Sequence, residues 1–365
     1  MRLERQKDSE KIEQLRPIFP NYVSEYVQVS LDNLTPTTVL SYMIDIQDFL
    51  EWMWHSICPE KAGIKEISLE DLERLIEIDI SHYRNHLKYR EQSHNIGKRF
   101  YKTANSDKTI SRKISALRSL FEFLSTNTNR NTGERYISKN ILENTKVSVT
   151  NVSVRVKAEK LKKSIIQLNE MDRFQHFILH GYGEEERTGM QMAYWKTNRY
   201  RDAAIISLLL TSGIRVGELS SLRLRDLMLE DRKIVVERKR NKEDVVPFSN
   251  KTLGLINEYL AIRETVYHAD TNNSSPLFVT KYRGKANAIS KNTVQKMITK
   301  YATAYGKPGL TAHVLRHSFG TNVFKKTKNI RGVQEILGHS NISTTQIYTH
   351  MLNDEERDLI DEVFE

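Results

Sequence analysis

Apolar residues recur at three- and four-residue steps through the first third of the chain, and this spacing restricts that part to helices. Thr35 can cap a helix with Pro36 at its first position, where a missing N–H costs nothing. The next apolar residues share one helical face: Val39, Met43, Ile46, Leu50 and Met53. A second helix is predicted from about Asp107, with a buried stripe of Ile110, Ile114, Leu117, Phe121 and Leu124. The chain is therefore predicted to begin with a helical bundle.

Three basic residues of the second helix, Arg112, Lys113 and Arg118, lie off its apolar stripe. Such charges usually form a solvated face. A basic face on a small helical domain is also what binding to a phosphate backbone requires. We therefore treat the three residues as candidate contacts to nucleic acid, with a solvated face as the alternative.

The helical pattern lapses where Asn and Thr cluster and a basic stretch poor in large apolar groups follows, between about residues 126 and 163. A length of 365 residues also suits two domains better than one. The predicted parts are, in order, an N-terminal extension (1–20), a helical domain (21–130), a linker region (131–166), a second domain (167–350) and a C-terminal segment (351–365).

The second domain is predicted to be mostly helical with a small antiparallel sheet. The segment LNEMDRFQHFIL has helical spacing, and the apolar run from Asp202 to Leu210 predicts a buried helix. β-Branched runs flank a charged turn between Lys233 and Phe248, which predicts a hairpin. Helices are expected again from about Lys291 to the end.

Composition limits the class of protein and its partners. There are 56 basic and 46 acidic residues, and the resulting net charge of +10 favours a polyanionic partner, nucleic acid ahead of a membrane surface. Cys58 is the single cysteine, so no internal disulfide can form. No run approaches the roughly 18 apolar residues of a membrane span, and the charged N-terminus is unlike a signal peptide. We expect a cytoplasmic protein that does not bind membranes.

Four short motifs in the second domain carry chemically distinctive residues. They are SGIRVGEL with Arg215 and Glu218, the hairpin turn with Lys239, HVLRH with His313, Arg316 and His317, and LGHSNISTTQIYTH with His339 and Tyr348.

In their order and spacing these motifs resemble the tyrosine recombinase (phage integrase) family, whose signature is Arg, Lys, His-x-x-Arg, His and Tyr. The resemblance covers residues 167–365 and extends more loosely to the helical domain, which looks like the family's core-binding domain. The layout is most similar to the Xer group. The opening segment and LNDEERDLIDEVF look like the single-protein Xer recombinase of Gram-positive bacteria.

The resemblance implies a mainly helical, C-shaped clamp of two domains, a SAM-like core-binding domain and a catalytic domain, that closes around duplex DNA. It also implies six catalytic residues: Arg215, Lys239, His313, Arg316, His339 and Tyr348. Tyr348 would be the nucleophile and would form a covalent 3′-phosphotyrosyl bond. Since that bond stores the energy of the broken phosphodiester, neither ATP nor an obligatory metal is implied, and no cofactor is expected.

The residue types suit this chemistry. Two guanidiniums, Arg215 and Arg316, can hold the negative charge that grows on the non-bridging oxygens. A phenol titrates near pH 10, so Tyr348 must pass its proton to a neighbour, expected to be His313. Lys239 is the expected proton donor to the departing 5′ oxygen, and His339 is expected to hydrogen-bond the phosphate.

Some of these assignments have alternatives. Lys242, three residues further on, competes with Lys239. His313 and His317 are four residues apart on a predicted helix, a spacing also used by zinc ligands, but the zincin motif needs Glu where this chain has Val314. His317 is expected to be structural. Glu218 is also expected to be structural, by orienting the helix that follows Arg215.

Other functions remain open at this stage. The stretch from Asn329 to His350 could be a helix-turn-helix of a non-catalytic DNA-binding regulator, although this gives no role to Arg215 or Lys239. A type IB topoisomerase would use similar chemistry without exchanging partners. A C-terminal helix starting near Asn353 favours exchange, because in this family such a helix docks into a neighbouring subunit of a tetramer on two DNA sites. Docking on its own domain is the alternative.

The biological role is expected to be resolution of chromosome dimers. Only about 20 residues precede the helical domain, too few for the arm-binding module of many phage integrases. Integration of a mobile element with the same chemistry is the alternative. An accessory translocase is a candidate partner besides the DNA site.

Overall fold

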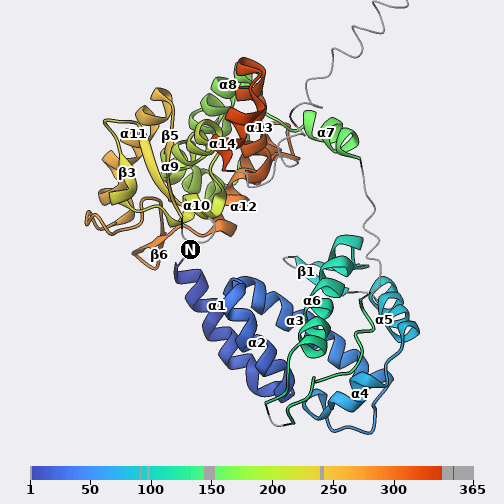
Figure 1. Ribbon diagram of the computed structural model, residues 1–365. Coiled ribbons are helices and arrows are strands. Elements are labelled where there is room, and N and C mark those ends of the chain that lie inside the picture. Colours follow the sequence, from blue (N-terminus) through green and yellow to red (C-terminus); the bar gives the residue numbers. More distant parts are fainter. Residues whose placement is uncertain are drawn as a thin grey trace, which may run out of the picture. The chain divides into compact units, whose positions relative to one another are not determined.

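The computed structural model describes residues 2–90, 92–96, 99–130, 132–143, 153–238, 242–338 and 348. The chain divides between residues 151 and 152 into two compact units (Figure 1). Each unit has its own hydrophobic core.

The described part of the first unit is a helical bundle with one antiparallel hairpin. Its elements are α1 (Arg2–Leu15), η1 (Arg16–Ile18), α2 (Asn21–Asn33), α3 (Pro36–Ser56), η2 (Ile64–Glu66), α4 (Leu69–Glu73), α5 (Glu77–Tyr89), β1 (Gln92–Ile96), β2 (Arg99–Thr103) and α6 (Asp107–Thr126). Thr35 caps α3 by accepting a hydrogen bond from the Thr38 N–H, and Pro36 is at the first helical position, as predicted.

The two predicted apolar stripes form the core of this unit. All ten predicted core residues of α3 and α6 are buried. The hairpin β1–β2 was not predicted, because its sequence, QSHNI and RFYKT, does not alternate apolar and polar residues as a half-buried strand does.

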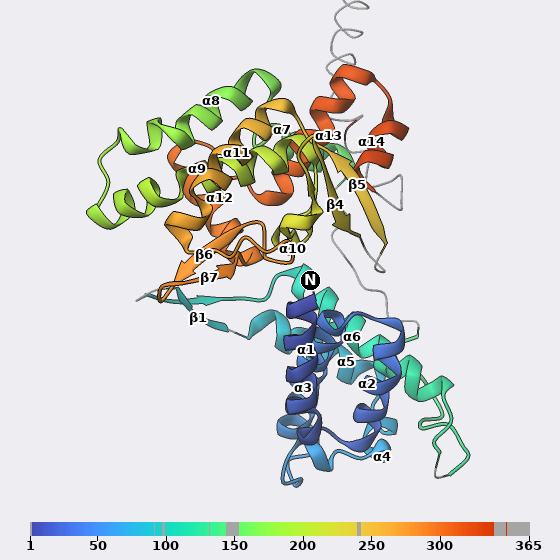
Figure 2. The ribbon, with the colours of Figure 1, turned by 90° about the vertical axis from the view of Figure 1, so that its left-hand side faces the viewer.

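Residues 2–20 form part of the bundle instead of a separate extension. They include α1, which packs along α3 (Figure 2). Ile12 and Phe19 are buried in the first core. Charged residues fill most of α1, so its few apolar contacts give too weak a pattern to be recognised in the sequence.

Part of the predicted linker region also belongs to the two cores. Buried residues of the first core are Ile137, Ile141 and Leu142, and those of the second are Ala158, Ile165 and Ile166. The second group lies on α7 (Val154–Lys162) and just after it. The sequence predicts a linker here because a few apolar residues within a polar stretch show no helical or strand periodicity.

In its described residues, the second unit is mostly helical, with two small antiparallel sheets. Beyond α7 its elements are α8 (Leu168–Leu179), η3 (Gly181–Gly183), α9 (Gly189–Ser212), α10 (Val216–Ser221), η4 (Leu224–Asp226), β3 (Leu227–Met228), β4 (Lys233–Glu237), β5 (Glu243–Pro247), α11 (Asn250–Tyr267), β6 (Val279–Tyr282), β7 (Lys285–Ala288), α12 (Lys291–Ala304), α13 (Ala312–Thr327) and α14 (Ile330–Leu337).

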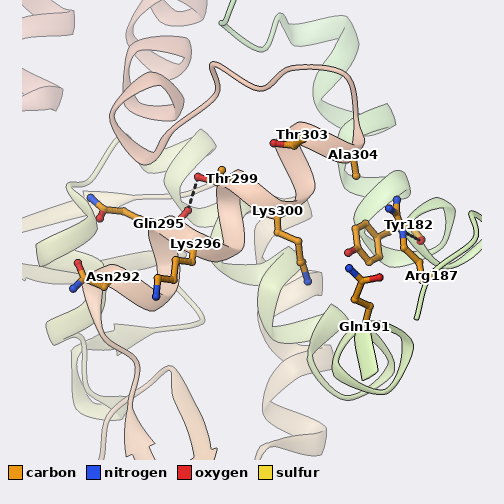
Figure 3. Close-up of a pocket in the computed structure, with 10 residues that line it drawn as sticks. All are labelled: Tyr182, Arg187, Gln191, Asn292, Gln295, Lys296, Thr299, Lys300, Thr303 and Ala304. Carbon is orange, nitrogen blue, oxygen red and sulfur yellow. Dashed lines mark hydrogen bonds between the residues drawn. The ribbon is translucent and has the colours of Figure 1, made fainter. Parts of the chain in front are cut away.

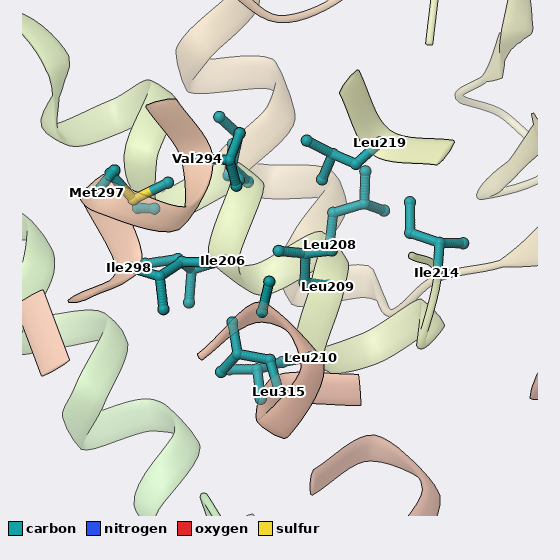
Figure 4. Packing of buried hydrophobic residues seen from close by; sticks show 14 of the residues in the cluster. Ile206, Leu208, Leu209, Leu210, Ile214, Leu219, Val294, Met297, Ile298 and Leu315 are labelled. Carbon is teal, nitrogen blue, oxygen red and sulfur yellow. The ribbon is translucent and has the colours of Figure 1, made fainter. Parts of the chain in front are cut away.

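Helix α9 is the centre of the second unit. Its residues 202–210 are all buried, and α8, α11 and α13 pack around it. Figure 4 shows Ile206, Leu208 and Leu209 of α9 among side chains of α10, α12 and α13. A helix that is apolar on all sides must be covered on all sides. The predicted buried helix is therefore confirmed.

The predicted hairpin is also confirmed in its described residues. Strands β4 and β5 pair antiparallel from Lys233 opposite Pro247 to Glu237 opposite Glu243, and β3 adds a third strand beside β4. The pair β6–β7 was not predicted. The predicted fold class, mainly helical with small antiparallel sheets, is confirmed.

Candidate active site

Arg215 is placed by a sharp turn at the end of α9. Gly213 ends that helix with φ of 65°. A Cβ atom on Gly213 would lie 2.4 Å from Phe319 Cδ1, so both the backbone conformation and the space require glycine. Two residues later, Arg215 occupies the position before the first turn of α10.

Glu218 fixes Arg215 in two ways. One carboxylate oxygen accepts the Arg215 backbone N–H at 2.8 Å, and the other accepts Arg215 Nη1 at 2.8 Å. Glu218 is buried, whereas the Arg215 side chain is 37% exposed. Glu218 therefore caps the start of α10, as expected of a residue that orients this helix. It also orients the Arg215 side chain, whose guanidinium can still contact a ligand from solvent.

Arg316 lies on α13 and is buried. Its guanidinium donates to the carbonyl oxygens of Gly213 and Leu337, at the C-terminal ends of α9 and α14. Carbonyls at helix ends lack partners within the helix and carry the negative end of its dipole. Burial, together with the positive charge of Arg215, lowers the pKa of Arg316 to about 10. The two predicted phosphate-binding guanidiniums therefore lie close enough to repel each other.

Tyr348 is buried against α13. A Cβ atom on Gly320 would lie 2.6 Å from Tyr348 Cζ, so the phenol lies directly on the helix backbone where no side chain intervenes. Burial raises the pKa of Tyr348 to about 12, and the charge of Arg316 acts in the opposite direction. The arginine pair and the phenol thus belong to one site, as the proposed chemistry requires.

The two histidines of HVLRH connect the phenol to this site. His317 Nδ1 lies 3.2 Å from Tyr348 Oη, and His317 Nε2 lies 3.1 Å from His313 Nε2. The direct contact of the phenol is therefore His317, which was expected to be structural, and His313 is one step further away. Residues four apart share a helix face, so the sequence alone could not rank them. Burial, with the charges of Arg316 and Arg215, lowers the pKa of His313 and favours its neutral form, which can accept a proton.

Two predicted catalytic residues, Lys239 and His339, lie outside the described residues, as does the C-terminal segment 351–365. Lys242, the competing lysine, is exposed, and its carbonyl accepts the Arg238 N–H at 2.7 Å. Among the described residues, no three His, Cys, Asp or Glu side chains are grouped so that they could hold a metal ion. The described helices include none long and apolar enough to cross a membrane.

The basic residues of α6 differ from the expected exposed face. Lys113 is buried, with Nζ 3.2 Å from Asp45 Oδ1 and 3.1 Å from Asp48 Oδ2. Arg112 is half-exposed and paired with Asp45. The interpretation of Lys113 as a surface charge is wrong, because two carboxylates of α3 draw its side chain into the bundle. Arg118 lines a polar cavity of about 560 Å³ and remains a candidate.

A basic cavity of about 770 Å³ lies between the start of α9 and one face of α12 (Figure 3). Lys296 and Lys300 of α12 and Arg187 before α9 line it. Lys300 Nζ lies 3.8 Å from the Tyr301 ring centre and 4.6 Å from that of Tyr194. Burial lowers the pKa of Lys300 to about 8. This basic cavity, called the groove beside α12 below, can attract an anion.

Comparison with known proteins identifies the family. Residues 183–355 match the model described as the phage integrase family. The chain is 33% identical to tyrosine recombinase XerS of Streptococcus agalactiae serotype III (strain NEM316), over 97% of this chain and 98% of the relative. It is 31% identical to tyrosine recombinase XerS of Streptococcus pyogenes serotype M5 (strain Manfredo), over 96% and 98%.

The chain belongs to the tyrosine recombinase family. Its fold agrees with that of a solved family member, the XerH site-specific recombinase in a post-cleavage complex with a palindromic difH substrate. The TM-score is 0.60 at 22% identity, over 91% of this recombinase and 82% of the solved chain. The identities of 33% and 31% to the two XerS proteins confirm the resemblance to the Xer group seen in the sequence.

Three residues that contact the site of this recombinase were not predicted: Gly213, Gly320 and Arg238, whose Nη1 donates to Glu218 Oε2 at 3.1 Å. A glycine inside an otherwise helical motif, as in HSFGTNV, is a sequence signal for close approach of another group. Arg238 gave no signal of its own, because it stands in a charged turn among other basic residues.

Proposed function

We propose that this recombinase cleaves and rejoins duplex DNA at specific sites through a 3′-phosphotyrosyl bond to Tyr348. The observation that supports this most directly is the meeting of Arg215, Arg316 and Tyr348 where the C-terminal ends of α9 and α14 meet α13. These residues come from chain positions up to 133 residues apart, 348 − 215. A non-catalytic regulator would have no need to gather them.

In the proposed reaction, Tyr348 Oη attacks the scissile phosphorus. A P–O bond to the tyrosine forms and the bond to the 5′ oxygen breaks. Arg215 and Arg316 bind the non-bridging oxygens, whose charge is greatest in the transition state. Each such donor typically contributes on the order of 3–4 kcal/mol.

Protons move at two places in this reaction. The phenol proton passes to His317 and from there to His313, along the contacts between the three rings. Lys239 protonates the leaving 5′ oxygen, and His339 hydrogen-bonds the phosphate. Religation reverses each step, with the 5′ hydroxyl of the new partner strand as the nucleophile, so two rounds proceed through a Holliday junction.

The groove beside α12 is the surface we assign to the DNA backbone. Its cations are Arg187, Lys296 and Lys300, and its polar side chains include Asn292 and Gln295. The amides suit hydrogen bonds to phosphates or base edges. The net charge of +10 supports the same partner.

We further propose that the recombinase acts as a homotetramer on two DNA sites, in the cytoplasm, and resolves chromosome dimers. Likeness to XerS proteins over nearly their full length supports this role. Integration of a mobile element by the same chemistry is the second candidate. Sequencing the DNA ends trapped on the protein separates the two, since one predicts a single chromosomal site and the other the ends of an element. Sedimentation of the complex on paired sites tests the tetramer.

The Tyr348→Phe variant tests the chemistry. It should bind its site as the wild type does and form no covalent adduct on a nicked suicide substrate, because phenylalanine lacks the attacking oxygen. Adducts are measured by denaturing gel electrophoresis. A variant that still traps DNA would show that a different residue is the nucleophile.

A further inference from the structure

Arg238 stands directly before Lys239, and its side chain is buried at the end of the β4–β5 hairpin. Its Nε donates to Asp244 Oδ2 on β5 at 3.0 Å, within the hairpin itself. Its Nη1 donates to Glu218 Oε2 on α10 at 3.1 Å. Because Glu218 also holds Arg215, one carboxylate joins the hairpin to the first of the phosphate-binding arginines.

The carbonyl end of α14 supplies two more acceptors. Arg238 Nη2 lies 3.3 Å from the Ile336 oxygen, and Nη1 lies 3.5 Å from the Leu337 oxygen. The Leu337 oxygen also accepts from Arg316. A Cβ atom on Gly338 would lie 3.3 Å from Arg238 Cζ, so glycine leaves the guanidinium room at this helix end.

Loss of Arg238 would affect the position of the hairpin more than the positions of Arg215 and Arg316. Without Arg238, Arg215 would keep its two bonds to Glu218, and Arg316 would keep its bond to Gly213. The hairpin would lose three hydrogen bonds that join it to α10 and α14. The Arg238 N–H also donates to the Lys242 carbonyl at 2.7 Å, so backbone and side chain anchor the same point of the hairpin.

We propose that Arg238 is a positioning residue, which holds the hairpin carrying Lys239 against α10 and α14 so that the lysine can protonate the leaving 5′ oxygen. This inference rests on the function proposed above. It differs from a purely structural role, in which Arg238 would stabilise the fold and leave the chemistry of the folded molecules unchanged.

The experiment compares two nicked suicide substrates, one with the normal 5′ oxygen at the scissile phosphate and one with a 5′-bridging sulfur. A thiolate is a good leaving group and needs no proton, so the sulfur substrate removes the need for an acid. Arg238→Lys keeps a positive charge but loses the planar fork. On the oxygen substrate its single-turnover cleavage should fall about 10- to 100-fold, the range expected for a displaced catalytic group. On the sulfur substrate most of this loss should disappear, as it should for Lys239→Ala.

Arg263→Lys is the matched control. Arg263 is buried to a similar degree and donates to three backbone carbonyls, those of Leu277, Asp270 and Pro276, on the α11 side of the unit. Arg263→Lys should lower thermal stability, and its cleavage rate relative to the wild type should be the same on both substrates. If Arg238→Lys does not fold, Asp244→Asn removes the negative charge of one partner of Arg238 and should give a smaller defect that sulfur also relieves.

The outcomes distinguish this inference from the proposed function. If Arg238→Lys cleaves the oxygen substrate at the wild-type rate, or if its defect is the same on sulfur while Lys239→Ala is rescued, the positioning role is overturned. The positioning role is also overturned if the sulfur substrate restores cleavage by Arg263→Lys to the same extent as cleavage by Arg238→Lys. If the wild type forms no adduct through Tyr348, the proposed function itself fails.

Discussion

At the scale of single residues, the site depends on two glycines as much as on its charged groups. Gly213 allows the turn that places Arg215, and Gly320 allows Tyr348 to lie on the backbone of α13. Between them, Arg316 binds the carbonyls at two helix ends. Arg316 and Tyr348 are thus placed by contacts with backbone groups, whereas Arg215 is placed by the Glu218 side chain.

Gly320→Ala should separate DNA binding from cleavage. The new Cβ would lie 2.6 Å from Tyr348 Cζ, so the ring must move. Cleavage of a suicide substrate should fall about 10- to 100-fold with site affinity retained, because a displacement of about 1 Å is enough for such a loss. Gly254→Ala on α11 is the control, since nothing lies within 4 Å of its Cβ. It should raise stability by about 0.5–1 kcal/mol and leave cleavage unchanged. Equal rates for both variants would contradict the close contact of Tyr348 with α13.

At the scale of elements, α3 and α6 are joined by a buried ion cluster as well as by their apolar stripes. Lys113 of α6 lies between Asp45 and Asp48 of α3. Burial raises the pKa of Asp45, and this effect is larger than the opposite effect of the positive charges of Lys113 and Arg112. Removal of Lys113 would leave the buried Asp45 carboxylate with the half-exposed Arg112 in place of two cations, and a buried charge that loses a partner is costly.

Lys113→Met should destabilise the first unit by about 3–5 kcal/mol. Loss of the ammonium raises the pKa of Asp45 further above its value in the unfolded chain. A raised pKa in the folded state means that stability falls as pH rises through it, so the deficit should be smaller at pH 5 than at pH 8. Urea unfolding at both pH values measures it, with exposed Lys108→Met as the control, expected to change stability by less than about 0.5 kcal/mol. A deficit that grows on acidification would contradict this account of the cluster.

At the scale of the whole molecule, the chain carries a net charge of +10, and the groove beside α12 is lined by the basic residues Arg187, Lys296 and Lys300. Each phosphate that a protein cation neutralises releases counterions from DNA. DNA binding by this recombinase should therefore weaken steeply as salt rises.

Lys296→Ala should lower the salt dependence of DNA binding. If Lys296 contacts one phosphate, the slope of log affinity against log salt concentration should become shallower by about 0.9. Fluorescence anisotropy at several salt concentrations measures the slope. Lys251→Ala, whose lysine already pairs with Asp172, should leave it unchanged. Identical slopes for Lys296→Ala and the wild type would exclude this groove as a phosphate contact.

The sequence by itself determined the helical bundle, the buried α9, the β4–β5 hairpin and the family. These features depend on local periodicity or on a motif whose order is preserved along the chain. It did not determine that α1 joins the bundle, that Lys113 is buried, or that His317 and not His313 contacts the phenol. Those outcomes depend on partners distant in sequence: the face of α3, the carboxylates of Asp45 and Asp48, and the position of Tyr348 on α13. Only the tertiary structure brings such partners together, because periodicity records which face of an element is apolar and not which groups that face meets.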